Sequence, residues 1–257
     1  MKNFKTIALL PLDNRPPSYL FPAQLAQIAG VELLLPPREF LGNLHHGAQR
    51  DSLERWLLQL PKVDAVIVAI DTLAFGGLAQ SRQLKDSQAN AINRLKVLLQ
   101  WHEQRPGVPL YAFNVLMRLG IAMDSDAVSI NHFNLQRYSR LVDEAEHFDS
   151  DYLRQQLEEV TAQIDPKVLS DYLSTRQRNH HINQEMLRWL ANGTFDFLSL
   201  VQEDCAEFGL HRGEQKALHE LITELHLEEN TSLHPGADEA GMVLLARLLD
   251  PKSPFTV

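Results

Sequence analysis

Six short apolar runs recur along the chain, with polar segments between them. They cover residues 6–12, 31–36, 64–70, 109–116, 196–202 and 231–235. The first five are rich in β-branched or bulky apolar residues and lack clean alternation with polar ones, which is typical of parallel strands covered on both faces. The sixth run is weaker, and its assignment as a strand rests mostly on its position.

Segments with helical spacing lie between these runs. They cover residues 51–60, 87–104, 183–191 and 213–225. Alternation of strands and helices predicts an α/β fold, with a mostly parallel sheet of about six strands flanked by helices and joined by right-handed crossovers. Both an open doubly wound sheet and an incomplete eight-stranded barrel fit this pattern.

One section interrupts the alternation. Residues 124–181 contain no good strand, and residues 133–147, 151–164 and 166–176 all have helical patterns. We therefore expect a single domain over residues 1–257 with a helical insertion at residues 124–192. This insertion is either a lid over the strand ends or a set of extra helices covering one face of the sheet.

Composition and charge exclude several classes of protein. The formal net charge of −9 repels nucleic acid and anionic lipid, so neither is expected as a partner. The one cysteine, Cys205, excludes an intramolecular disulfide and a Cys-rich zinc site. The apolar run at residues 6–10 is too short for a signal peptide, and no stretch has the apolar length of a membrane span. We expect a cytoplasmic protein.

Polar side chains follow nearly every predicted strand. Because the carboxyl ends of parallel strands meet at one edge of the sheet, these side chains are candidates for binding a small-molecule substrate there. The candidates are Asp13, Asn14, Arg15, Asp71, Asn114, Arg118, Gln202 and Asp204. Each aspartate alone is more often a helix cap or a turn former, and Pro16-Pro17 reads as a stiff exit from the first strand. Several such residues together favour a functional site.

Cofactor and metal signals are weak. The stretch AFGGLAQSR, residues 74–82, is a glycine turn leading into a helix, but it matches neither the Walker loop nor the dinucleotide-binding pattern. The adjacent pairs His45-His46 and His180-His181 point in different directions on any regular element, so they rarely bind one metal. We expect no cofactor and assign no metal ligand.

The segment HPGADE, residues 234–239, combines two acids at a strand end. Asp238 and Glu239 are the candidate catalytic residues, because paired carboxylates can divide proton donation from substrate positioning. The alternative is an acidic pair that begins the following helix and interacts favourably with its dipole.

Several segments together resemble a bacterial family catalogued as domain of unknown function 4127. They include LPLDNRPP (10–17), DTLAFGGLAQSR (71–82), YAFNVLMR (111–118), RNHHIN (178–183), DFLSLVQEDCAEFG (196–209) and PGADEAG (235–241). Members of that family are about twice this length, so the resemblance implies an N-terminal half or a truncated member. HPGADE is also similar to a strand-end motif of family 20 glycoside hydrolases, which implies Glu239 as general acid and Asp238 as the residue that positions the substrate.

The leading hypothesis is an enzyme acting on a small polar or sugar-like substrate, by glycoside hydrolysis with the Asp-Glu pair. One alternative is a non-catalytic module that binds a ligand or a partner chain, either as a homodimer or as half of a larger protein. A metal-assisted hydrolase is the third hypothesis.

Overall fold

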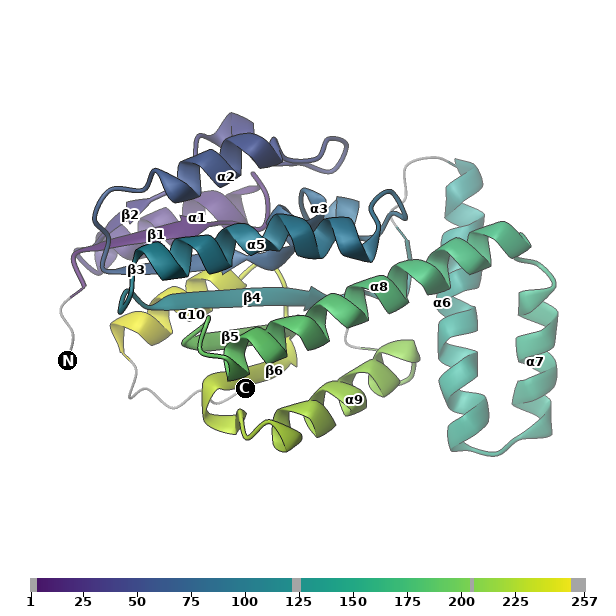
Figure 1. Ribbon diagram of the computed structural model, residues 1–257. Coiled ribbons are helices and arrows are strands. Elements are labelled where there is room, and N and C mark those ends of the chain that lie inside the picture. The colour runs from purple at the N-terminus through teal and green to yellow at the C-terminus, as the bar shows by residue number, and fades with distance from the viewer. Residues whose placement is uncertain (1–3, 122–125, 204–205, 251–257) are drawn as a thin grey trace.

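The computed structural model describes residues 4–121, 126–203 and 206–250. Six strands within these residues form one sheet, and all of them are parallel (Figure 1). The strands are β1 (Thr6–Leu10), β2 (Glu32–Leu34), β3 (Ala65–Ala69), β4 (Leu110–Leu116), β5 (Phe197–Gln202) and β6 (Thr231–Pro235). Their order is β2-β1-β3-β4-β5-β6, so β2 and β6 are the two edges of an open sheet. The parallel α/β prediction is confirmed, in its open form and not as a barrel.

Helices cover both faces of this sheet. They are α1 (Pro16–Ile28), α2 (Arg50–Leu58), α3 (Ile70–Phe75), α4 (Leu78–Ser81), α5 (Gln88–Gln104), α6 (Asp126–His147), α7 (Asp151–Thr161), α8 (Pro166–Ala191), α9 (Leu210–Glu224) and α10 (Ala240–Leu249), with short 3-10 turns η1 (Arg38–Phe40) and η2 (Glu228–Asn230). Figure 1 shows α5, α8 and α9 in front of the strands and α1 and α10 behind them. Among the described residues, no helix combines the length and apolar character needed to cross a membrane.

Two apolar cores result from the alternation of side chains along each strand. Ala8 and Leu10 of β1 face the core shared with α2, α5, α8 and α9. Ile7 and Leu9 face the core shared with α1 and α10. All five residues of β3 are buried, which explains why its sequence, AVIVA, contains no polar position.

The starts of several helices follow from local sequence. Ser87 and Ser150 cap α5 and α7 by accepting a hydrogen bond from a backbone N–H three residues ahead. Asp165 caps α8, and a proline follows it at the first helical position. Pro16 and Pro17 likewise begin α1, a helix that the sequence patterns did not predict.

Helices α6 and α7 stand beyond the carboxyl ends of the strands (Figure 1). A small third core contains Leu135 of α6, Ile164, which follows α7, and Tyr172 of α8. The second half of α8 lies in the helical layer over the sheet, where Ile182 and Met186 are fully buried. Residues 124–192 therefore include two helices outside the sheet layers and one long helix that links them to it.

Candidate functional site

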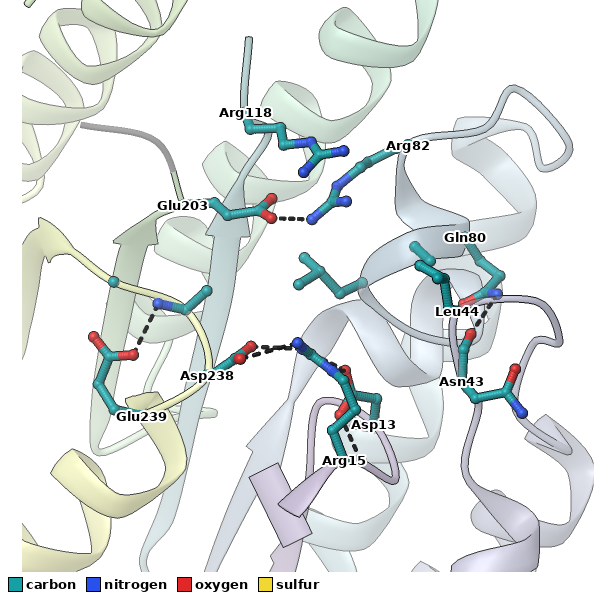
Figure 2. A pocket seen from close by; sticks show the side chains of 14 residues that line it. Asp13, Arg15, Asn43, Leu44, Gln80, Arg82, Arg118, Glu203, Asp238 and Glu239 are labelled. Atoms are coloured by element: carbon teal, nitrogen blue, oxygen red, sulfur yellow. Dashed lines mark hydrogen bonds and ion pairs between the residues drawn. The ribbon is translucent and has the colours of Figure 1, made fainter. Parts of the chain in front are cut away.

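A cavity of about 660 Å³ lies at the carboxyl edge of the sheet (Figure 2). Helix α1, which follows β1, packs on one face of the sheet, whereas α5, which follows β3, packs on the other. The space between the exits of β1 and β3 is thus a topological switch point, the usual ligand site of open parallel sheets. The cavity is lined by Asp13, Arg15, Asn43, Leu44, Leu78, Ala79, Gln80, Arg82, Arg118, Glu203, Gly236, Ala237, Asp238 and Glu239.

Arg15 joins the loop after β1 to the loop after β6. Its Nε donates to Asp13 Oδ2 at 2.7 Å, while Nη1 and Nη2 donate to the two carboxylate oxygens of Asp238 at 3.0 and 2.5 Å (Figure 2). Burial lowers the pKa of Arg15, but the carboxylates of Asp13 and Asp238 raise it by more, so its guanidinium stays charged. This bidentate pair fixes Asp238 at the cavity wall.

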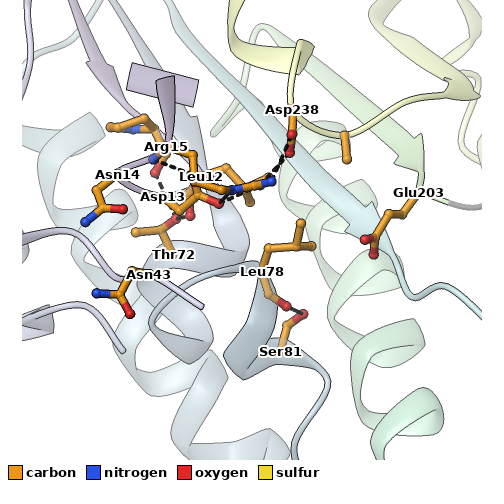
Figure 3. A network of polar contacts seen from close by, with 12 residues as sticks. Leu12, Asp13, Asn14, Arg15, Asn43, Thr72, Leu78, Ser81, Glu203 and Asp238 are labelled. Atoms are coloured by element: carbon orange, nitrogen blue, oxygen red, sulfur yellow. Dashed lines mark hydrogen bonds and ion pairs between the residues drawn. The ribbon is translucent and has the colours of Figure 1, made fainter. Parts of the chain in front are cut away.

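Hydrogen bonds connect the segment that follows β1 to the segment that follows β3. The Thr72 hydroxyl, in α3, lies 2.9 Å from the carbonyl oxygen of Pro11 and 2.8 Å from that of Leu12 (Figure 3). Thr72 is fully buried. The loop that carries Asp13 and Arg15 is therefore held against α3.

A second group of charges forms another wall of the cavity. Arg82, which directly follows α4, pairs through Nη2 with Glu203 at the end of β5. Figure 2 shows Arg118, just beyond β4, on the same wall. Burial lowers the pKa of Arg82, the Glu203 carboxylate raises it, and the charges of Arg118 and Arg15 add to the lowering, with a net downward shift.

Side chains of helix α8 donate hydrogen bonds to the backbone beside Arg82 and at Arg118. Arg178 and Asn179 both donate to the carbonyl oxygen of Ser81, at 2.5 and 2.9 Å, immediately before Arg82. Arg176 Nη1 donates to the carbonyl oxygen of Arg118 at 2.8 Å. Arg176 also makes two hydrogen bonds to Glu214 of α9, at 2.8 and 2.7 Å.

Asp71 and Asn114 do not line the cavity but form a buried pair. Asp71 Oδ2 accepts from Asn114 Nδ2 at 3.1 Å and from the backbone N–H of Val115 at 2.9 Å. Burial is the main cause that raises the pKa of Asp71, to about 6, against the lowering effect of these two hydrogen bonds. Asp71 is thus a carboxyl that changes its charge near neutral pH.

Glu239 lies at the cavity but its carboxylate is folded onto its own loop. Oε2 accepts from the backbone N–H of Ala237 at 3.3 Å, and Figure 2 shows the Glu239 and Asp238 side chains pointing to different sides of the loop. Gly236 has φ +138, and a Cβ there would lie 2.1 Å from Glu239 Oε1. Only glycine leaves room for this arrangement.

The structure divides the predicted site residues into three groups. Asp13, Arg15, Arg118, Asp238 and Glu239 line the cavity. The pair Asp71–Asn114 is buried outside the lining, as is the side chain of Gln202, which accepts from Gln215 at 3.4 Å. Asn14 is half-buried and contacts neighbouring loops through its backbone, donating to Gly42 and accepting from Arg38. Asp204 lies outside the described residues.

Sequence reasoning missed Arg82 and Glu203 as members of the site. Each carried a signal: Arg82 ends the stretch AFGGLAQSR after β3, and Glu203 directly follows the last residue of β5. Glu203 is therefore a strand-end residue like the predicted ones, whereas Arg82 lies at the end of α4, where strand ends alone do not point to it.

Histidine and acidic side chains do not gather into a metal-binding group in the part of the chain that the structure describes. The backbone N–H groups of His45 and His46 both donate to Asn43 Oδ1, at 2.8 Å each, in an exposed loop. His180 contacts Gln184 within α8.

Comparison with known protein families identifies one family. The model of the family described as "Protein of unknown function (DUF4127)" matches residues 7–254. This confirms the resemblance seen in the sequence segments. A search of curated proteins finds no match.

Proposed function

The chain belongs to the DUF4127 family of proteins of unknown function, and we propose from its pocket that it is an enzyme acting on a small, hydroxyl-rich substrate of sugar size. The observation that carries this proposal is the convergence on one cavity of charged residues from three strand ends and from the end of α4, namely Asp13, Arg15, Arg82, Glu203 and Asp238. A volume of about 660 Å³ is within the range of small-molecule sites.

Substrate hydroxyls suit this lining because a hydroxyl both donates and accepts hydrogen bonds. Each Asp238 oxygen retains acceptor capacity beyond its bond to Arg15. Asp238, fixed by Arg15, is suited to position the substrate. Glu239 is the proposed general acid. Its carboxylate accepts a hydrogen bond from the backbone N–H of Ala237 at 3.3 Å, which is a long and therefore weak hydrogen bond. We propose that the Glu239 side chain leaves this contact to reach the substrate.

Hydrolysis of methyl glycosides tests this assignment, using the N-acetylglucosaminide, the glucoside and the glucuronide, because a methoxide leaving group needs a proton from the general acid. We expect release of methanol from at least one of them, and a rate reduced by roughly 10²–10⁴-fold in Glu239→Gln, the usual contribution of a general acid. Glu185→Gln, on α8 and away from the cavity lining, is the matched control and retains the wild-type rate. A Glu239→Gln variant as active as the wild type would remove Glu239 from the mechanism.

A non-catalytic ligand-binding module is the second candidate. It is favoured by the ion pairs Asp13–Arg15–Asp238 and Arg82–Glu203, because paired carboxylates suit recognition better than proton transfer. Binding of the sugars without turnover of any glycoside would favour this candidate. For either function we propose action in the cytoplasm, a compartment in which a chain that cannot form an intramolecular disulfide is common.

A further inference from the structure

The cavity has a positive wall. Arg82 and Arg118 contribute two guanidinium charges, and Glu203 contributes one carboxylate, which leaves one net positive charge. Among the described residues, no carboxylate pairs with Arg118, whose hydrogen bond runs from Nη2 to the carbonyl oxygen of Ile121 at 2.9 Å.

The opposite wall carries an excess of negative charge. Asp13 and Asp238 share the single cation Arg15, which leaves one net negative charge, and Glu239 on the same loop as Asp238 adds a further carboxylate. The cavity is therefore polarised, with acceptors for hydroxyl hydrogens at one end and excess positive charge at the other.

The positive wall is built into the fold. Arg82 is 8% exposed and is held next to Ser81, whose carbonyl oxygen accepts from Arg178 and Asn179. Arg118 follows β4, and its backbone carbonyl accepts from the buried Arg176. Two like charges fixed side by side repel one another unless an anion lies between them.

Both guanidiniums retain hydrogen-bonding capacity. Within the described chain, the Nε atoms of Arg82 and Arg118 and the Oε2 atom of Glu203 are buried without a hydrogen-bond partner. Arg82 uses Nη2 for Glu203 and Arg118 uses Nη2 for Ile121, so Nη1 of each remains for a ligand.

We propose that Arg82 and Arg118 bind a carboxylate group of the substrate, so that the ligand is a sugar acid whose hydroxyls contact Asp13 and Asp238. This inference rests on the proposed function, because it assigns the substrate class of the same cavity. A carboxylate carries one negative charge and matches the single net positive charge of this wall. A phosphate monoester carries close to two charges at neutral pH and would leave a net negative charge in a protein whose formal charge is already −9.

Calorimetric titration compares three probes that share a hexose ring: D-glucuronate, D-glucose and D-glucose 6-phosphate. The wild-type protein is expected to bind glucuronate at least tenfold more tightly than glucose, and also more tightly than the phosphate. Arg118→Gln removes the cation that has no paired carboxylate, and we expect it to weaken glucuronate binding roughly tenfold or more while leaving glucose binding nearly unchanged. Arg118→Lys, which keeps the charge, restores part of the affinity.

Arg154→Gln, in exposed α7, is the matched control and binds glucuronate as the wild type does. Thermal melting without ligand checks that each variant is folded. Equal affinity for glucuronate and glucose, or a preference that survives Arg118→Gln, overturns the carboxylate site and leaves the proposed function standing. Tighter binding of the phosphate overturns the carboxylate assignment. Binding of none of the probes by the folded wild type contradicts the proposed function as well.

Discussion

Replacing Asp71 with asparagine tests the electrostatics beneath the cavity. Asp71 is 1% exposed, and its carboxylate is surrounded by Asn114 and Val115 of β4, by the charge of Glu203 at the end of β5, and by the charge of Arg178 on α8. Asparagine has the same shape and keeps an oxygen that accepts the two hydrogen bonds from β4. The substitution therefore removes the titration of this group with little change in packing.

The magnitude follows from the pKa of Asp71, which burial raises to about 6. An ordinary aspartate in the unfolded chain has a pKa of about 3.9, and a difference of this size corresponds to about 3 kcal/mol of free energy of unfolding. Because the folded protein binds this proton more tightly, the stabilisation is complete below about pH 4. It is lost as the pH rises through about 6, where the buried group must ionise.

Urea unfolding followed by tryptophan fluorescence, repeated between about pH 4 and pH 8, measures this effect. We expect the free energy of unfolding of Asp71→Asn, minus that of the wild type, to rise by about 3 kcal/mol across this range. Asp64 is the control: backbone hydrogen bonds from Thr6 and Lys5 lower its pKa from the ordinary 3.8, so it titrates below this range and the difference between Asp64→Asn and the wild type should stay nearly constant from pH 4 to pH 8. A difference between Asp71→Asn and the wild type that stays constant from pH 4 to pH 8 would refute the reasoning.

Two further predictions concern the elements that support the cavity. Arg176→Met leaves Glu214 without its ion-pair partner and should lower the free energy of unfolding by about 3–5 kcal/mol in urea, whereas Arg188→Met, in an exposed pair, should cost less than about 1 kcal/mol. Equal losses of unfolding free energy in Arg176→Met and Arg188→Met would contradict the claim that a buried ion pair matters more for stability than an exposed one. Gly42→Ala would place a Cβ 2.4 Å from the backbone oxygen of Gly76, so we expect about 1–3 kcal/mol of destabilisation, and a wild-type melting temperature would contradict it.

The sheet was predictable because strands buried on both faces are continuous runs of apolar residues in the sequence. A parallel strand such as Ala65–Ala69 tolerates no polar side chain, and β-branched residues favour the extended backbone. Helix α1 was missed because Pro16-Pro17 fits a stiff loop as well as a helical first turn. The helix Pro166–Ala191 was divided in two because its middle carries buried polar residues such as Arg178 and Asn179, which break the apolar periodicity.

The sequence predicted that the site lies at the carboxyl ends of the strands, but not which side chains line it. Parallel strands bring their carboxyl ends to one edge, but the loop geometry decides which side chains face the cavity. Arg15 and Asp238 are 223 positions apart, and they meet because α10 packs on the face of the sheet that α1 also covers. No local pattern specifies that the neighbouring Glu239 turns away from Asp238. That arrangement depends on the conformation of Gly236, which only the folded loop defines.

The most direct test of the account is a crystal structure of the protein soaked with D-glucuronate. We predict that the sugar lies in the cavity at the switch point, with its carboxylate between Arg82 and Arg118 and its hydroxyls at Asp13 and Asp238. A sugar bound elsewhere on the molecule, with this cavity filled only by solvent, would contradict the claim that the polar strand ends form one ligand site.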